Sequence, residues 1–367
     1  MRVLAVNVGS TSVKLRVIGE YDRVEGSLDL PPLATLAPGA LHSALVELGS
    51  VDAIGHRIVH GGVAFTSPVA LTASVVASLR ALTDLAPLHQ PPALDAVSLV
   101  ALARPDVPAV ACFDTAFHAT LPDEASTYAV PLSWRELGAR RYGFHGLSHS
   151  WASERAASLL AGVAFVSRGS RLSRVVTCHL GGGGSLAAVL GGRCVDTSMG
   201  FTPLDGLVMA TRSGSVDPGL ILWLQQDRGL STEQIADDLE HRSGLVGLCG
   251  TADMREVTVR VSAGDPLATL AFGVYVHRLR SGIAAMAASL DGLDAVVFTG
   301  GIGQGSAAVR AAACAGLGFL GIEIDALLNA SAVADQSISA AGSTVAVFVV
   351  EAREDLVIAA GVRGVIG

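Results

Sequence analysis

The stretch that decides the fold is VLAVNVGSTSVKLRVIG, residues 3–19. Its first part, residues 3–7, is apolar and rich in β-branched residues, and its last part, VKLRVIG, is again largely apolar. Two such runs around a turn of Gly, Ser and Thr predict a β-hairpin. The same order returns near Val175, where RVVTCHL precedes GGGGS and LAAVLGG. The chain therefore carries one strand–turn–strand pattern twice.

A third apolar run, DAVVFTGGIGQGS, begins at Asp294 and ends in glycines that lead into a helical pattern. Helical patterns lie at residues 150–161, 266–289 and 306–316. Strands that alternate with helices predict an α/β protein, here with mixed sheets in two related halves. Segment 159–173 is expected to be a helix end followed by a polar loop.

The composition is that of a folded globular protein. Half of the 367 residues are apolar and 16% are charged, which allows a large core and, by length, suggests two domains. The formal net charge is −8 and no long basic run occurs, so no nucleic-acid groove is expected. An anionic ligand would have to be attracted by local arginines, backbone N–H groups or a cation.

The cysteines and the N-terminus favour a cytoplasmic protein. The five cysteines show no C-x-x-C spacing, which indicates buried, reduced thiols. The N-terminal run MRVLAVNVGS is too short for a signal peptide and has no small-residue cleavage site. No stretch of about 18 residues is apolar throughout, so we expect no membrane span and no membrane partner.

Three glycine-containing segments are candidate contacts for phosphate or nucleoside. In the first, from Asn7 to Lys14, a turn of Gly, Ser and Thr offers N–H and hydroxyl donors beside a positive charge. This segment lacks the Walker P-loop pattern, and a plain hairpin turn is the alternative. In the second, HLGGGGS at residues 179–185, four glycines let the backbone approach a ligand closely. In the third, GGIGQGS at residues 300–306, glycines lead from a strand to a helix N-terminus.

Several ionisable side chains lie within otherwise apolar or small-residue segments. They are Arg57 in GHRIVHGG, Asp114 in CFDTAFH, His145 in RRYGFHGLSH, Arg212 in MATRSGSVDP and Arg255 in TADMREV. Charges in such surroundings need partners or a ligand, and structural ion pairs are the alternative to a site. A structural role is favoured for His56, His60, His89, His118 and His149. The chain has no H-E-x-x-H motif and no Cys/His cluster that would indicate zinc.

Taken in order along nearly the whole chain, these segments resemble the acetate kinase family. The resemblance rests on NVGSTSVK, HRIVHGG, LAPLHQPP, FDTAFHATLPDEASTYAVP, RRYGFHGLSH, TCHLGGGGS, VDTSMGFTPLDGLVMATRSGSVDP, SGLVGLCG and VVFTGGIG. It implies a duplicated ribonuclease-H-like fold of the sugar-kinase, heat-shock ATPase and actin superfamily, in two lobes with an interlobe active-site cleft. The N-terminal lobe would be residues 1–117 plus a C-terminal helix in 354–367. The nucleotide-binding lobe would be residues 118–353, with hinge regions near residues 117 and 353.

The resemblance also implies an activity and its partners. The activity is reversible transfer of the γ-phosphoryl group of ATP to acetate, with Mg²⁺ or Mn²⁺ as cofactor, in an expected homodimer. The implied catalytic residues are Arg57, Asp114, His145 and Arg212. The implied ATP-binding residues are Ser10, Ser12, Lys14, His179, Gly181, Gly182, Gly183, Asp253, Met254, Arg255, Gly301, Ile302, Gly303, Gln304 and Gly305. The acetate methyl would meet Val59, Leu88, Phe144 and Pro203 beside Arg57, and Asn7 and Glu354 would serve the metal.

The implied chemistry suits these residue types. A carboxylate acceptor with a pKa of about 4–5 is already ionised at neutral pH and needs no general base. The difficulty is repulsion between two anions, which two arginines and Mg²⁺ can offset, while His145 could donate a hydrogen bond to a phosphoryl oxygen. Direct in-line transfer is therefore favoured. The small apolar pocket predicts that propionate is a poorer substrate, since one methylene changes affinity by about 1–3 kcal/mol.

Two segments depart from the family pattern. Where the family reads H-L-G-N-G, this chain has Gly182 in place of Asn. Where the family reads G-I-G-E-N, this chain has Gln304 and Gly305 in place of Glu and Asn. A lost amide contact is worth about 0.5–1.5 kcal/mol, so weaker or less selective nucleotide binding is expected. The chain is also shorter than is usual between residues 20 and 50. The alternatives are a propionate or short-chain fatty acid kinase, the same fold with another phosphoryl donor such as pyrophosphate, and a catalytically weak nucleotide sensor. Gly301 argues against pyrophosphate, because a small residue there keeps the adenine pocket open.

Overall fold

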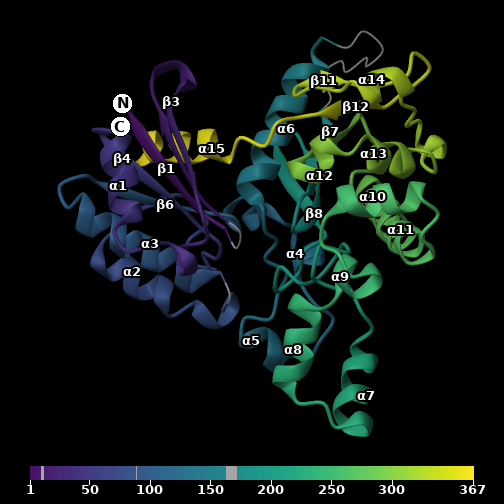
Figure 1. The fold of residues 1–367 in the computed structure, drawn as a ribbon, viewed down its shortest axis with the longest axis horizontal. Coiled ribbons are helices and arrows are strands. Elements are labelled where there is room, and N and C mark those ends of the chain that lie inside the picture. Colours follow the sequence, from purple (N-terminus) through teal and green to yellow (C-terminus); the bar gives the residue numbers. More distant parts are fainter. Residues whose placement is uncertain (10–11, 88, 163–171) are drawn as a thin grey trace. The chain divides into compact units, whose positions relative to one another are not determined.

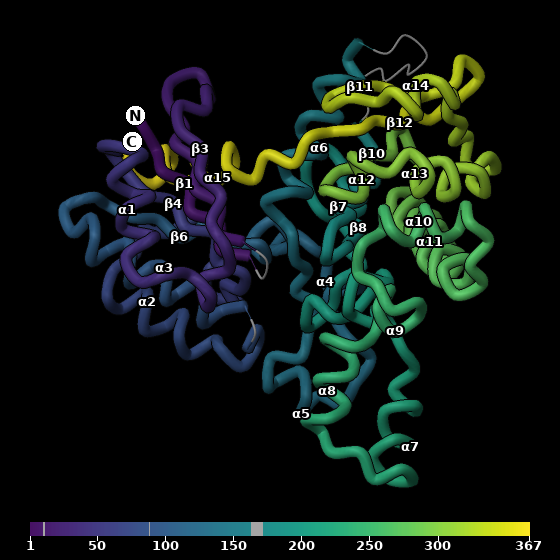
Figure 2. Tube along the Cα trace, viewed as in Figure 1, coloured from purple at the N-terminus to yellow at the C-terminus, as the bar shows by residue number. Residues whose placement is uncertain are grey.

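The computed structural model describes residues 1–9, 12–87, 89–162 and 172–367. The chain divides into two compact units. Unit 1 comprises Met1–Ala119, Phe144–Trp151 and Arg353–Gly367, and unit 2 comprises Thr120–Gly143 and Ala152–Ala352. Figure 1 shows the helices and strands, and Figure 2 shows the path of the chain through each unit. Ser10, Leu88 and most of the loop expected at 159–173 lie outside the described residues.

Unit 1 is built on a six-stranded mixed sheet in the order β3-β2-β1-β4-β6-β5. The strands are β1 (Val3–Val8), β2 (Val13–Ile18), β3 (Val24–Leu30), β4 (Ala53–Ile58), β5 (Val69–Ala70) and β6 (Ala109–Phe113). β1 and β2 run antiparallel, with Val3 opposite Ile18 and Asn7 opposite Lys14, so the hairpin predicted from residues 3–19 is confirmed. β4 runs parallel to β1, and β6 parallel to β4, so the carboxyl ends of these three strands meet at one edge of the sheet.

Helices cover both faces of this sheet. They are α1 (Ala40–Glu47), α2 (Ala73–Arg80), α3 (Gln90–Ala103) and α15 (Glu354–Ile366), with 3₁₀ turns at Glu20–Asp22, Leu33–Thr35, Thr83–Leu85 and Ala116–Thr120. α1 and α3 share a core with Ile54 of β4, while α15 packs on the opposite face through Ile358 and Val362. Gly55 permits this packing, because a Cβ atom there would lie 2.3 Å from Ile358 Cγ2. The two chain ends consequently lie together in unit 1 (Figure 2).

Unit 2 repeats this topology. Its sheet has the order β11-β12-β10-β7-β8-β9. The strands are β7 (Arg174–Leu180), β8 (Gly184–Leu190), β9 (Arg193–Thr197), β10 (Ala295–Thr299), β11 (Gln336–Ser337) and β12 (Ala346–Val349). β7, β8 and β9 form an antiparallel meander, β10 and β12 run parallel to β7, and β11 is an antiparallel edge strand. Followed from β9 to β11, the strand order of unit 2 matches that of unit 1 from β3 to β5, strand for strand. The prediction of two related halves is therefore confirmed.

Unit 2 carries most of the helices. They are α4 (Asp123–Ser126), α5 (Leu132–Glu136), α7 (Pro218–Arg228), α8 (Thr232–His241), α9 (Gly244–Cys249), α10 (Met254–Ser262), α11 (Pro266–Ser289), α12 (Gly300–Gly305), α13 (Ala307–Cys314) and α14 (Ala326–Ala330), with a 3₁₀ turn at Gly318–Leu320. The helix predicted at 266–289 is confirmed as α11, and Asp265 Oδ1 caps it by accepting from Leu267 N–H at 2.9 Å. The helix expected at 306–316 is α13. The helix expected at 150–161 begins earlier, as α6 (Gly146–Leu160), and His149 N–H already donates to the His145 carbonyl at 2.9 Å in its first turn.

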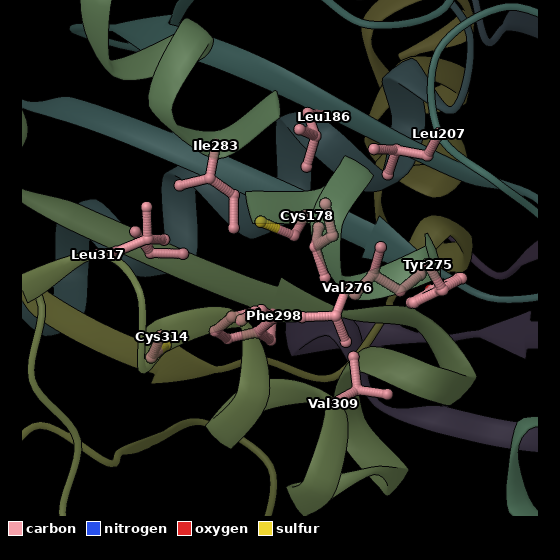
Figure 3. Packing of buried hydrophobic residues seen from close by; sticks show 14 of the residues in the cluster. Cys178, Leu186, Leu207, Tyr275, Val276, Ile283, Phe298, Val309, Cys314 and Leu317 are labelled. Carbon is pink, nitrogen blue, oxygen red and sulfur yellow. The ribbon is translucent and has the colours of Figure 1, made fainter. Parts of the chain in front are cut away.

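The core of unit 2 lies between α11 and the sheet (Figure 3). Tyr275 and Ile283 of α11 belong to one apolar cluster with Cys178 of β7 and Phe298 of β10. All five cysteines of the chain are buried free thiols, as predicted. Among the described helices, none combines the length and the apolar character that crossing a membrane requires.

Candidate active site

The first group of predicted residues lies in unit 1, at the carboxyl ends of β4 and β6. These strands are parallel neighbours, and Asp114 directly follows β6. Arg57 Nε lies 3.0 Å from Asp114 Oδ1, and Arg57 Nη2 lies 2.5 Å from Asp114 Oδ2. The two side chains are 14% and 1% exposed. They form a buried bidentate ion pair, which fixes the plane of the guanidinium group.

Asn7 and Glu354 extend this ion pair into a network of four side chains. Arg57 Nη1 donates to Asn7 Oδ1 at 3.1 Å, and Asn7 Nδ2 donates to Glu354 Oε2 at 2.6 Å. Asn7 belongs to β1, whereas Glu354 is the first residue of α15, 347 positions later. Unit 1 thus brings together Asn7 and Glu354, which are predicted to bind the metal. They join Arg57 and Asp114, which are predicted to be catalytic.

Burial and the neighbouring charges set the protonation of this network. Burial raises the pKa of the Asp114 carboxyl and Glu354 raises it further, whereas Arg57 and a backbone hydrogen bond from His145 lower it, with a net upward shift. Burial lowers the pKa of Arg57, but Asp114 and Glu354 raise it by more. Arg57 therefore stays cationic throughout the physiological pH range, held between two acidic groups.

His145 has a backbone conformation that is rare outside glycine, with a φ of +58°. Gly146 N–H donates to the Asp114 carbonyl at 2.9 Å, and the Asp114 carboxylate accepts a backbone hydrogen bond from His145. On the other side of the turn, His118 Nε2 lies 2.9 Å from the carbonyl oxygen of Phe144. Strained backbone of this kind clusters at functional sites, so the geometry supports a role for His145.

Arg212, the second predicted arginine, lies in unit 2 in the loop before α7. Its Nη1 donates to the Pro203 carbonyl at 3.0 Å, and its Nε lies 3.4 Å from Glu240 Oε2 on α8. Burial lowers the pKa of Arg212, and Glu240 raises it by less. The backbone of the same loop reaches the glycine turn after β7, because Ala210 N–H donates to the Gly182 carbonyl at 3.1 Å. Unit 2 therefore places the loop of Arg212 against the second predicted phosphate segment.

The two glycine segments of unit 2 lie at the carboxyl edge of the parallel pair β7 and β10. In the first, Gly181 N–H donates to the Gly183 carbonyl at 2.8 Å, and a Cβ atom at Gly182 would have no atom within 4 Å. The second forms α12, where Gly300 has a φ of +78° and a Cβ atom would lie 2.6 Å from the Leu180 carbonyl oxygen. Ligands of parallel α/β sheets bind at this edge, so the placement suits a nucleotide.

The predicted adenosine residues divide between surface and core. Asp253 caps α10 by accepting from Arg255 N–H at 2.9 Å, and Arg255 Nη2 lies 2.7 Å from Asp253 Oδ2. The Arg255 side chain is 90% exposed, whereas Met254 packs in the core of unit 2. Gly301 and Gly305 have open space where a Cβ atom would lie. The side chain of Arg255 is therefore accessible to a ligand, and that of Met254 is not.

The described residues of the predicted acyl pocket are buried in their own units. Val59 and Phe144 are buried in unit 1, and Pro203 is buried in unit 2. The Phe144 ring meets the edge of the His60 ring, with centroids 5.6 Å apart. Leu88 lies outside the described residues.

The first hairpin turn is described in part. Gly9 N–H donates to the Ser12 carbonyl at 2.9 Å, and Lys14 is exposed on β2, opposite Asn7. Ser10 lies outside the described residues. The described part is a tight hairpin with its cation exposed beside the Arg57 network, which suits either a phosphate contact or a plain turn.

The residue types of unit 1 fit a magnesium ion. Asn7, Asp114 and Glu354 carry amide and carboxylate oxygens, which Mg²⁺ prefers as ligands. In the part of the chain that the structure describes, no group of three or more His, Cys, Asp or Glu side chains could hold a metal alone. Such a cage is not required, because enzymes that act on phosphates hold Mg²⁺ by one or two carboxylates together with the phosphate oxygens.

Two residues that sequence reasoning missed support the predicted ones. Glu240 pairs with Arg212, and the buried Arg310 donates to the carbonyls of Gly303 and Gln304 at 2.9 and 2.6 Å. Arg310 is a lone charge in a small-residue segment, so the signal that indicated Arg57 could also have found it. Glu240 lies in a polar helix and has no local signal.

Two units of matching strand order, with glycine turns and arginines at the carboxyl edges of their sheets, define an α/β protein built to bind a phosphorylated ligand. Comparison with known proteins gives the family. Residues 33–360 match the acetokinase family. The chain is 47% identical over 328 residues to an acetate kinase of Nostoc sp., covering 89% of this chain and 79% of that protein. It is 43% identical over 401 positions to an acetate kinase of Streptomyces avermitilis, covering 100% and 98%.

Solved structures agree with this match. A propionate kinase from Francisella tularensis has a TM-score of 0.90 and 34% identity, and an acetate kinase from Porphyromonas gingivalis has a TM-score of 0.87 and 33% identity. Each comparison covers 100% of both chains. The chain belongs to the acetokinase family and has the acetate kinase fold. It is therefore a kinase, a phosphotransferase with a carboxyl group as acceptor.

Proposed function

We propose that this chain transfers the γ-phosphoryl group of ATP reversibly to acetate, giving acetyl phosphate and ADP, with Mg²⁺ as cofactor. The observation that carries the proposal is the buried network of Arg57, Asp114, Asn7 and Glu354. It combines a fixed cation with two carboxylates and an amide. That combination suits an anionic substrate together with a metal.

Arg57 and Arg212 are proposed to reduce the repulsion between two anions. An acetate oxygen forms the new bond to the γ-phosphorus while the bond to the ADP oxygen breaks in line. Because acetate is already ionised, no side chain has to remove a proton. The bidentate contact to Asp114 holds the Arg57 guanidinium in one plane, so its charge is oriented before substrate binds.

His145 is proposed to donate a hydrogen bond to an equatorial oxygen of the transferring group. Its left-handed backbone, braced by Asp114 through Gly146 and by His118 through Phe144, fixes the direction in which the imidazole leaves the chain. A preoriented donor stabilises charge that develops in the transition state at little reorganisation cost. His145 would act electrostatically and would not itself carry the phosphoryl group.

Glu354, with Asn7 and Asp114, is proposed to hold Mg²⁺ in company with the nucleotide phosphates. When bound, the ion would neutralise negative charge on those phosphates. The chain's own residues keep the ligand set in place, since Asn7 bridges Arg57 and Glu354.

The second candidate function is propionate kinase, the activity named for the Francisella tularensis protein of similar structure. Val59 and Phe144, both buried in unit 1, are proposed to contact the methyl group of acetate closely, which favours acetate over propionate. The experiment is acyl phosphate formation, trapped with hydroxylamine, across acetate, propionate and butyrate with ATP, GTP and pyrophosphate. Acetate with ATP should give the highest kcat/KM. Equal or higher kcat/KM for propionate would contradict the acetate assignment.

We also propose that the chain is a homodimer that associates through α7. Its apolar side chains Leu220, Leu222 and Trp223 are 42%, 54% and 43% exposed, and no residue of this helix is buried. A second copy of the same helix could cover such a face. Size-exclusion chromatography with light scattering should give twice the chain mass for the wild-type protein, and the monomer mass for Leu222→Glu. A monomeric wild-type protein would contradict this assignment.

A further inference from the structure

The loop that carries Arg212 is fastened to the C-terminal end of α8 from both sides. Thr211 Oγ1 donates to the Glu240 carbonyl at 2.8 Å, and Ser213 N–H donates to the Leu239 carbonyl at 3.2 Å. The last carbonyls of a helix have no partner within it, so these contacts satisfy groups that need one. The residues on each side of Arg212 are thereby held to α8, Thr211 through its hydroxyl group and Ser213 through its backbone N–H.

The side chain of Glu240 then reaches the Arg212 guanidinium group. Arg212 Nε lies 3.4 Å from Glu240 Oε2, while Arg212 Nη1 is held by the Pro203 carbonyl at 3.0 Å. The two charged side chains are only 14% and 20% exposed. A guanidinium group held at two of its nitrogens has a defined plane and direction.

Glu240 differs in this respect from the other acidic residues of α8. Asp237 and Asp238 both pair with Arg242, at the helix surface, where the three side chains are 46–63% exposed. Exposed ion pairs of this kind contribute little to the stability of the fold. Glu240, in contrast, forms an ion pair that is mostly shielded from water, and its partner is Arg212, a proposed catalytic residue.

We propose that Glu240 is a positioning residue that orients Arg212 for phosphoryl transfer. This inference rests on the proposed function, because it acts through Arg212. Without the Glu240 carboxylate, the Nε side of the guanidinium group loses its anionic neighbour and the side chain samples more directions. Small misplacements of a substrate-orienting group lower turnover on the order of 10- to 100-fold.

The test compares Glu240→Ala, Glu240→Gln and the surface control Asp237→Asn by steady-state kinetics. Glu240→Ala should lower kcat at least about tenfold with an unchanged KM for ATP. Glu240→Gln keeps an oxygen acceptor and should recover most of the loss, and Asp237→Asn should match the wild type. In an Arg212→Lys background, Glu240→Ala should cost less than twofold, because the interaction is already altered. An unchanged kcat in Glu240→Ala, or an equal loss in both backgrounds, would overturn the proposal.

A second measurement does not depend on turnover. Phenylglyoxal labels arginine side chains, and mass spectrometry of digested protein reports the rate at each site. Glu240→Ala should speed the labelling of Arg212 several-fold while leaving that of Arg255, whose side chain is 90% exposed, unchanged. If the wild type forms no acetyl phosphate, the proposed function fails, and the labelling still decides whether Glu240 holds Arg212. An unchanged rate at Arg212 would overturn the inference.

Discussion

Arg57 and Asp114 lie 57 positions apart in the sequence and form a bidentate ion pair, with Arg57 Nη2 at 2.5 Å from Asp114 Oδ2. The parallel register of β4 and β6, which sets Arg57 opposite Cys112, brings them together. A buried ion pair is weak evidence for stability, because desolvation offsets much of the attraction. Its geometry matters more here, since it holds a cation in one orientation beside Asn7 and Glu354.

Removing one partner of this pair should damage both folding and catalysis. Arg57→Ala leaves the Asp114 carboxylate buried without its counter-charge, which should lower the free energy of unfolding by about 3–5 kcal/mol. Loss of a transition-state arginine should lower kcat by a factor of about 10³ or more. Denaturant unfolding and acetyl phosphate formation measure the two effects.

The double variant Arg57→Met/Asp114→Leu separates them. Replacing both charges with apolar side chains removes the uncompensated buried charge, so it should restore much of the stability while leaving kcat as low as in Arg57→Ala. If the double variant recovered activity together with stability, the pair would be structural, and Arg57 would have no role in transfer.

An asparagine at position 182 should strengthen nucleotide binding. A Cβ atom at Gly182 meets no atom within 4 Å, so the turn after β7 can accept the side chain. One regained hydrogen bond of about 0.5–1.5 kcal/mol corresponds to a KM for ATP between about twofold and tenfold lower. Gly305→Asn, also in open space, should act in the same direction. Unchanged KM values in both variants would show that the missing amides do not limit ATP binding.

Glu354→Gln should raise the Mg²⁺ concentration needed for half-maximal activity by about tenfold or more. The amide keeps the size of the side chain but loses the charge that the metal prefers. Asp355→Asn is the matched control, since the neighbouring Asp355 carboxylate pairs with Arg353 at 2.9 Å. An identical Mg²⁺ dependence in Glu354→Gln and Asp355→Asn would remove Glu354 from the metal site.

Acid should destabilise the protein through its buried histidines. Burial lowers the pKa of His56, His60 and His118 to about 4. The unfolded chain binds a proton at each near pH 6.5, whereas the folded chain does not until about pH 4. Stability is therefore full above pH 6.5 and falls as the pH drops toward 4, by about 1.4 kcal/mol per pH unit for each such group.

Urea unfolding at pH 7.5, 6 and 5 measures this slope. In His56→Phe this slope should be shallower by one histidine's share. The ring at position 56 is buried in unit 1, and a phenylalanine there takes up no proton when the chain unfolds. A slope that is the same in His56→Phe as in the wild type would assign the acid sensitivity to other groups.

Local sequence patterns predicted the parts of the fold that depend on local chemistry. Apolar runs around glycine turns gave both hairpins, and the helical pattern at residues 266–289 gave α11. The repeated strand–turn–strand pattern predicted two related halves with mixed sheets, whereas the order of the six strands in each sheet was known only from the structure.

Contacts between distant segments were beyond local patterns. The sequence indicated Arg57 and Asp114 as charges that need partners, but their pairing depends on strand register. The positive φ of His145 carries no signal, because no glycine or asparagine marks it. Glu240 was missed because its contact with Arg212 is between distant segments: it depends on the hydrogen bonds that Thr211 and Ser213 make to the end of α8.

The central claim is phosphoryl transfer from ATP to acetate, and the fate of labelled phosphate tests it most directly. The protein is incubated with [γ-³²P]ATP and Mg²⁺, with and without acetate, and the products are separated. We predict label in acetyl phosphate when acetate is present, and label retained in ATP, with none on the protein, when it is absent. Release of labelled inorganic phosphate at the same rate with and without acetate would contradict the account.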